Sequence, residues 1–104
     1  MLLVRIVVAK IKDQRRLQSI LKHTPLRPEL EGWNCVGWVQ EAFNNVAGDK
    51  GAVSSCAPNW RAVRDTAMWY VEKKKAEHRF DGTVEYDQNK APTWDMLERR
   101  EVFP

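Results

Sequence analysis

The sequence predicts an α+β fold, in which a small antiparallel sheet is packed by three or four helices. Two patterns indicate this class. Residues 2–11 (LLVRIVVAKI) carry branched apolar side chains on both alternating faces, which is typical of a buried strand. Four later segments each open with a residue that favours the start of a helix. Because 104 residues suffice for one modest core, we predict a single domain over residues 1–104.

The predicted helices follow capping residues along the chain. They cover residues 13–23, 34–47, 59–79 and 93–100, with Asp13, Asn34, Asn59 and Thr93 as the candidate N-caps. Pro25 and Gly48 are expected to end the first two helices, because proline and glycine disfavour continuation. Between the second and third helices, the segment GDKGAVSSCAP is expected to form a loop.

The predicted strand over residues 2–11 needs a partner, because an isolated strand cannot satisfy its backbone hydrogen bonds. No other segment predicts a convincing strand. We therefore expect another chain to complete the sheet. A homodimer that pairs residues 2–11 with themselves is the simplest form, and strand addition to a different protein is the alternative.

Composition favours a soluble, cytoplasmic protein. Hydrophobic residues make up 43% of the chain and charged residues 30%, which is ordinary for a globular domain. The start, MLLVRIVVAKIK, lacks the basic region and cleavage site of a signal peptide and is too short to span a membrane. With two cysteines and no secretory signal, free thiols in a reducing compartment are expected.

Charge and ligand patterns argue against several classes of function. The net charge is only +3, and the run Lys73–Lys75 is expected to lie on a solvated helix face, so a nucleic-acid partner is not expected. Two cysteines and two histidines are too scattered for a metal site. The five glycines form no phosphate-binding loop. We expect neither a metal nor a cofactor.

Cys35, in the stretch EGWNCVGWVQEAF, is the candidate nucleophile. With Asn34 as N-cap, this cysteine is the first helical residue, where unpaired N–H groups favour a thiolate. The same groups could serve as an oxyanion hole. The alternative is a core position, because Trp33 and Trp38 flank the cysteine and free cysteines are commonly buried.

A cysteine nucleophile needs a base, and the chain contains only His23 and His78. His23 is the better candidate, because the loop that follows it could double back toward Cys35. His78 ends the long third helix, where its charged form is favoured. For both residues the alternative is a surface histidine at a helix end.

Several tryptophans are candidates for a pocket or an interface. Trp33 and Trp38 bracket Asn34 and Cys35, so an aromatic wall beside the helix start could line a pocket for a small apolar ligand. Trp69 and Trp94 fall outside the apolar stripes of their predicted helices, and such exposed aromatic residues often contact a partner chain.

Three motifs carry a resemblance to a known family. WNCVGWVQEAF, WRAVRDTAMWYVEKKKAEHRFDG and APTWDMLERREVFP, taken in this order, are similar to the C-terminal portion of an uncharacterised domain family of filamentous fungi. The layout of that family in turn resembles circularly permuted papain-like thiol enzymes of the lecithin-retinol acyltransferase type. The resemblance implies a nucleophile at Cys35. It also implies a histidine on an upstream strand, and this chain begins after the point where that histidine would lie.

Two functions follow from these observations. The favoured one is a non-catalytic interaction or ligand-binding module that keeps a thiol-enzyme-like scaffold without its histidine. The alternative is a cysteine-dependent hydrolase or acyltransferase acting on an amide or ester. In that case Cys35 attacks, and His23 or a partner chain supplies the base. An upstream segment carrying the missing histidine would make this chain a fragment and would favour the enzyme.

Overall fold

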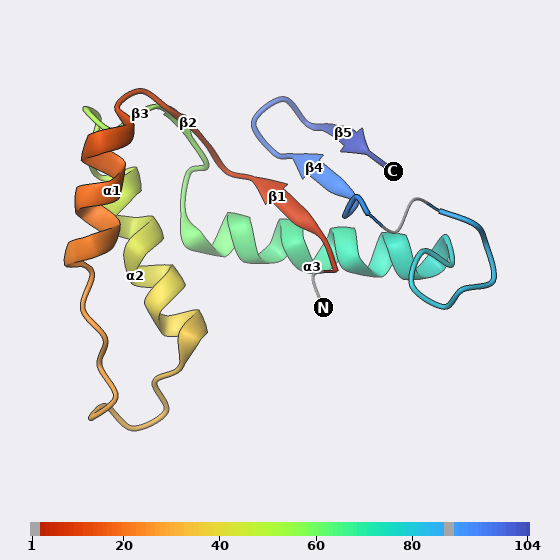
Figure 1. The fold of residues 1–104 in the computed structure, drawn as a ribbon, viewed down its shortest axis with the longest axis horizontal. Coiled ribbons are helices and arrows are strands. Elements are labelled where there is room, and N and C mark those ends of the chain that lie inside the picture. The colour runs from red at the N-terminus through yellow and green to blue at the C-terminus, as the bar shows by residue number, and fades with distance from the viewer. Residues whose placement is uncertain (1–2, 87–88) are drawn as a thin grey trace. The chain divides into compact units, whose positions relative to one another are not determined.

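The computed structural model describes residues 3–86 and 89–104, and this part of the chain forms an α+β structure (Figure 1). Its elements are β1 (Arg5–Val7), β2 (Ala9–Ile11), α1 (Gln14–His23), α2 (Cys35–Ala47), β3 (Val53–Cys56), α3 (Trp60–Ala76), β4 (Thr93–Asp95) and β5 (Arg100–Phe103). The predicted fold class is therefore confirmed. None of the helices in these described ranges has the length and apolar character needed to cross a membrane.

The chain divides into two compact units, each described here by itself. One holds Ala9–Trp60, and the other holds Met1–Val8 together with Arg61–Pro104. A single folding domain stays a prediction.

The unit Ala9–Trp60 is a helical hairpin, α1 and α2, with the two-stranded antiparallel sheet β2–β3. Both helices begin at the predicted caps: the Asp13 side chain accepts from Arg16 N, and that of Asn34 accepts from Val36 N and Gly37 N. The buried centre is formed by Val46, Ala52 and Val53, against which Ala9, Leu17, Ile20 and Cys56 pack. Apolar residues of α1 and α2 thus cover β2–β3, which explains why both helices keep a helical apolar spacing.

The unit Met1–Val8 with Arg61–Pro104 contains the three-stranded sheet β1-β4-β5 and α3, whose residues from Arg61 on belong to it. β1 runs parallel to β4, and β4 runs antiparallel to β5. The buried residues include Lys74, Arg79, Thr93 and Asp95 as well as Val63, Tyr70 and Pro92. Because buried polar groups are costly unless they are hydrogen-bonded, the polar contacts of this unit decide how it is held together.

Two predicted elements are wrong. The predicted strand over residues 2–11 begins outside the described residues, and residues 3–11 do not form one strand, because β1 and β2 belong to different sheets and are separated at Val8. Residues 93–100 do not form a helix. They contain β4, a turn and the start of β5. Oδ1 of Asp95 accepts from the N–H groups of Leu97 and Glu98, and Arg99 has a φ of 55°, so this segment reverses direction instead of coiling.

The loop predicted between the second and third helices is also wrong in part, because it contains β3. The premise that the chain offers a single strand therefore fails, since β3 pairs with β2, β4 pairs with β1, and β5 pairs with β4. Completion of a sheet by a further chain stays a prediction.

Candidate functional site

Cys35 lies at the first position of α2, and its side chain is exposed. Asn34 is the N-cap, as its place in the sequence predicts. Its Oδ1 accepts hydrogen bonds from Val36 N at 3.0 Å and from Gly37 N at 3.3 Å. These are N–H groups of the kind that an oxyanion hole would use. Because Asn34 already accepts from both, an oxyanion that used these two N–H groups would have to displace the cap.

His23 ends α1 with an exposed side chain, as expected, and bonds within its own helix. Its Nδ1 lies 2.7 Å from the carbonyl oxygen of Ser19. A carbonyl oxygen can only accept, so Nδ1 carries the proton, and Nε2 of the neutral ring is the remaining acceptor. Within the described residues, no hydrogen bond joins His23 to Cys35. The structure thus does not show the paired thiol and imidazole of a thiol enzyme.

Trp33 and Trp38 shape the loop before α2 and the first turns of this helix. The Trp33 ring covers Gly37 so closely that a Cβ added there would lie 3.0 Å from Trp33 Cδ1. Trp38 Nε1 donates to the carbonyl oxygen of Thr24 at 3.1 Å, which ties α2 to the C-cap residue of α1. Both indoles therefore have a packing role in the unit Ala9–Trp60. A ligand-binding role for them stays a prediction.

Trp69 and Trp94 come together in the other unit. Their rings meet edge to face with centroids 4.9 Å apart, and the Tyr70 ring lies 5.9 Å from that of Trp94. Trp69 remains 47% exposed, whereas Tyr70 is fully buried. The aromatic group thus begins at the surface and continues inward to a buried phenol whose hydroxyl meets charged groups.

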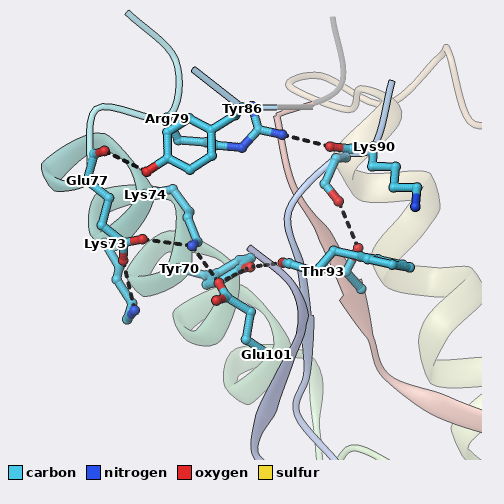
Figure 2. A network of polar contacts seen from close by, with 11 residues as sticks. Tyr70, Lys73, Lys74, Glu77, Arg79, Tyr86, Lys90, Thr93 and Glu101 are labelled. Atoms are coloured by element: carbon cyan, nitrogen blue, oxygen red, sulfur yellow. Dashed lines mark hydrogen bonds and ion pairs between the residues drawn. The ribbon is translucent and has the colours of Figure 1, made fainter. Parts of the chain in front are cut away.

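The best-developed polar arrangement in the described residues is a cluster formed by Tyr70, Lys74, Glu77 and Glu101, here called the Lys74 cluster (Figure 2). Lys74 is fully buried, and its Nζ lies 2.5 Å from Oε2 of Glu101 and 2.9 Å from Oε1 of Glu77. The Tyr70 hydroxyl donates to the same Glu101 oxygen at 2.7 Å. One carboxylate of β5 therefore receives hydrogen bonds from two residues of α3.

Further contacts surround the Lys74 cluster. Lys73 Nζ bonds the second oxygen of Glu77 at 2.8 Å, and the Tyr86 hydroxyl donates to the Glu77 carbonyl oxygen at 3.0 Å. The Arg79 guanidinium lies over the Tyr86 ring at 4.8 Å and donates to the Lys90 carbonyl oxygen at 2.7 Å (Figure 2). These contacts fasten the segment after α3 to the helix end.

The electrostatics of the Lys74 cluster favour fixed protonation states. Burial alone would lower the pKa of Lys74, but its hydrogen bonds to Glu101 and Glu77 outweigh burial, and the pKa is raised. Burial would raise the pKa of Glu101, but bonds from Lys74 and Tyr70 outweigh it, and the pKa is lowered. For Tyr70, burial and the Glu101 carboxylate together raise the pKa far above its ordinary value.

These protonation states indicate what the Lys74 cluster does. A lysine that holds its proton is neither a base nor a nucleophile at neutral pH, and a buried tyrosine that keeps its proton is not a base. The charges are also balanced, because two ammonium groups (Lys73 and Lys74) face two carboxylates. The arrangement therefore acts as a structural clamp that holds the C-terminal strand β5 to α3.

The Lys74 cluster is not predicted from the sequence, because the run Lys73–Lys75 is expected to lie on one solvated helix face. That interpretation is wrong for Lys74, although Lys73 and Lys75 are 43% and 59% exposed. The usable signal was spacing: Tyr70, Lys74 and Glu77 follow one another at four and three residues, which places them on one side of α3 and of the residue that follows it. Lys74 therefore lies on the same helix face as the buried Tyr70.

Comparison with known proteins assigns nearly the whole chain to a family but gives no activity. Residues 1–103 match a model described as a family of unknown function (DUF6914). No curated protein and no solved structure matches the chain.

Proposed function

We propose that this chain, which belongs to the family of unknown function DUF6914, is a non-catalytic interaction module whose partner is a second copy of itself. In this proposal the scaffold is of the thiol-enzyme type suggested by the fungal resemblance, and the protein acts in the cytoplasm. The two free cysteines are compatible with that compartment. The proposed self-association rests on the outer edge of β1, to which no described strand of the same sheet is paired.

β1 lies at one edge of its sheet, because the strand order is β1-β4-β5. Arg5 N donates to the Pro92 carbonyl oxygen at 2.9 Å, and Met96 N donates to the Val7 carbonyl oxygen at 3.2 Å. In a parallel ladder the bonding residues of a strand alternate, so Arg5 and Val7 face β4, and the N–H and C=O of Ile6 point to the other side. An edge of this kind is a template for a further strand.

The sequence of β1 suits pairing with its own copy. If two β1 strands run antiparallel with Ile6 on the two-fold axis, each Ile6 exchanges both backbone bonds with the Ile6 of the second copy. Arg5 then lies opposite Val7 of the second copy, so the two cationic side chains do not oppose each other. Pairing of two copies at this register is therefore free of like-charge repulsion along β1.

The surroundings of Cys35 support a non-catalytic role. The nearby N–H groups of Val36 and Gly37 are bonded to Asn34, and the described contacts of His23 lie within α1. An acyl-transfer site would need both the N–H groups and the imidazole to be directed at the reacting carbonyl. Interaction through β1 requires neither.

A pair of charge substitutions at Val7 tests the proposed dimer. In the antiparallel register, Val7→Arg places an arginine opposite Arg5 of the second copy, whereas Val7→Glu places a carboxylate there. We expect Val7→Arg to weaken dimerisation and Val7→Glu to strengthen it, by roughly two- to fivefold each at low salt. Sedimentation equilibrium at matched concentrations measures both constants, and circular dichroism confirms that both variants fold.

A proline substitution tests the backbone bonds of the same edge. Ile6→Pro removes an N–H that β4 does not use, so the monomer should fold while the dimer weakens by roughly 10- to 100-fold. Ile6→Val keeps the N–H and is the matched control. A folded Ile6→Pro protein that dimerises as tightly as Ile6→Val would overturn the β1 interface, as would equal dimerisation of the two Val7 variants.

A cysteine-dependent hydrolase or acyltransferase remains the second candidate, because Cys35 is exposed at the start of a thirteen-residue helix. In that reaction the sulfur attacks an ester carbonyl, the leaving group takes up a proton, and water later releases the acyl group. Our proposal predicts no burst of p-nitrophenolate from p-nitrophenyl acetate beyond that of the Cys35→Ser variant. A burst of one equivalent per chain that disappears in Cys35→Ser would instead establish the enzyme.

A further inference from the structure

A hollow in the unit Ala9–Trp60 lies beside β3 and has a volume of about 540 Å³. It is lined by Lys12, Ala47, Lys50, Val53, Ser54, Ser55 and Cys56. The volume falls within the range of pockets that hold small molecules. All of the lining residues belong to the one compact unit Ala9–Trp60.

The charged residues that line the hollow are all positive. Lys12 and Lys50 supply two ammonium groups, and no carboxylate is among the lining residues. In the part of the chain that the structure describes, neither lysine takes part in an ion pair. Two carboxylates adjoin these lysines in sequence: that of Asp49 is held by the Arg16 guanidinium at 2.7 Å and 2.8 Å, and that of Asp13 accepts from Arg16 N at 3.1 Å. The positive charge of the two lysines is therefore available to a ligand.

The remaining lining residues divide into hydroxyl and apolar groups. Ser54 and Ser55 carry hydroxyl groups, of which that of Ser54 donates to the Lys10 carbonyl oxygen at 3.4 Å, whereas Ala47, Val53 and Cys56 offer apolar surface. Burial raises the pKa of the Cys56 thiol, so this side chain stays neutral at physiological pH and adds no negative charge. Cations and a hydroxyl beside an apolar wall are what an amphiphilic anion requires.

We propose that this hollow binds a small molecule that carries a phosphate or carboxylate group on an apolar body. Lys12 and Lys50 bind the anionic group, and Ala47, Val53 and Cys56 contact the apolar body. No residue of β1 lines this hollow, so the test of the ligand does not depend on the proposed dimer.

Cys56 provides the readout, because it lines the hollow. In a Cys35→Ser background, the rate of iodoacetamide labelling at Cys56 is measured by mass spectrometry with increasing phenyl phosphate, hexanoate, inorganic phosphate or benzyl alcohol. We expect saturable protection, at least threefold, by phenyl phosphate or hexanoate, and weaker protection by inorganic phosphate and by benzyl alcohol. Iodoacetamide is uncharged, so the lysines do not steer it.

Matched lysine variants show where the anion binds. Lys12→Gln with Lys50→Gln should abolish the protection, whereas Lys22→Gln, which changes a lysine of α1 that does not line the hollow, should leave it intact. Comparing the labelling rate with and without ligand within each variant cancels any direct effect on the thiol. Absence of protection by phenyl phosphate and hexanoate at 10 mM (roughly the weak limit for a specific site), or protection that survives the double substitution, would overturn the proposal.

Discussion

Lys74→Ala is expected to lower the free energy of unfolding by about 3–5 kcal/mol. The ammonium group is fully buried between Glu101 and Glu77, and Tyr70 donates to the same Glu101 oxygen. Removing the lysine leaves the Glu101 carboxylate without its nearest counter-charge, and this loss has a larger effect than the loss of the pair's attraction. Urea denaturation followed by tryptophan fluorescence measures the change.

The neighbouring lysine is the matched control. Lys73 also bonds Glu77, but its side chain is 43% exposed, so Lys73→Ala should cost only about 0.3–0.5 kcal/mol. The double variant Lys74→Met with Glu101→Met removes both the buried ammonium and the carboxylate that it neutralises, so most of the stability should return. Equal losses for Lys73→Ala and Lys74→Ala would show that the Lys74 cluster does not clamp β5.

Acid is expected to destabilise the protein through Glu77 and Glu101. Hydrogen bonds from Lys73 and Lys74 lower the pKa of Glu77 from its ordinary value of 4.5. Burial would raise the pKa of Glu101, but hydrogen bonds from Lys74 and Tyr70 outweigh burial and lower this pKa from 4.5 as well. A carboxyl whose pKa is lower in the folded state contributes stability above its unfolded pKa and loses it as the pH falls toward its folded pKa. The free energy of unfolding should therefore be nearly constant between pH 6 and 8 and fall below about pH 4.5.

Glu101→Gln isolates the contribution of this carboxyl to acid sensitivity. The variant should be less stable at pH 7, because Lys74 loses a charged partner, and its stability should fall less steeply below about pH 4.5. Urea denaturation at half-unit steps of pH compares the two proteins. An unchanged slope in Glu101→Gln would assign the acid sensitivity to other carboxyl groups.

Helix starts could be predicted from the sequence because they depend on local chemistry. Asp13 and Asn34 were predicted caps, and both accept backbone bonds at the expected helix starts. The third helix ends at Ala76 rather than at 79, and His78 follows with a φ of 59°. Capping is decided within a few residues, so one sequence suffices to locate it.

Strand pairing could not be predicted in the same way. β1 and β2 are adjacent in sequence, but they pair with β4 and β3, partners that lie far along the chain. From its residue type, Thr93 is also suited to cap a helix. Only its pairing with Arg5 and Phe103 makes it part of a strand. Short strands depend on such distant partners more than on their own composition.

The same distinction between local and distant contacts decides which site residues could be predicted from the sequence. The position of Cys35 at a helix start follows from its neighbour Asn34, whereas the surroundings of His23 depend on how the intervening loop folds. The burial of Lys74 depends on Glu101, which reaches α3 only through the β4–β5 pairing. Roles that rest on local position were therefore predictable, and those that rest on tertiary contacts were not.

The mass of the unmodified chain in solution tests the central claim most directly. Sedimentation equilibrium from 1 to 200 µM (roughly the range in which a modest interface is populated) should give an average mass that rises toward twice the 12.1 kDa of one chain. That result would support a module that pairs through β1. A mass that stays at 12.1 kDa over the whole range would contradict self-association as the function of this edge.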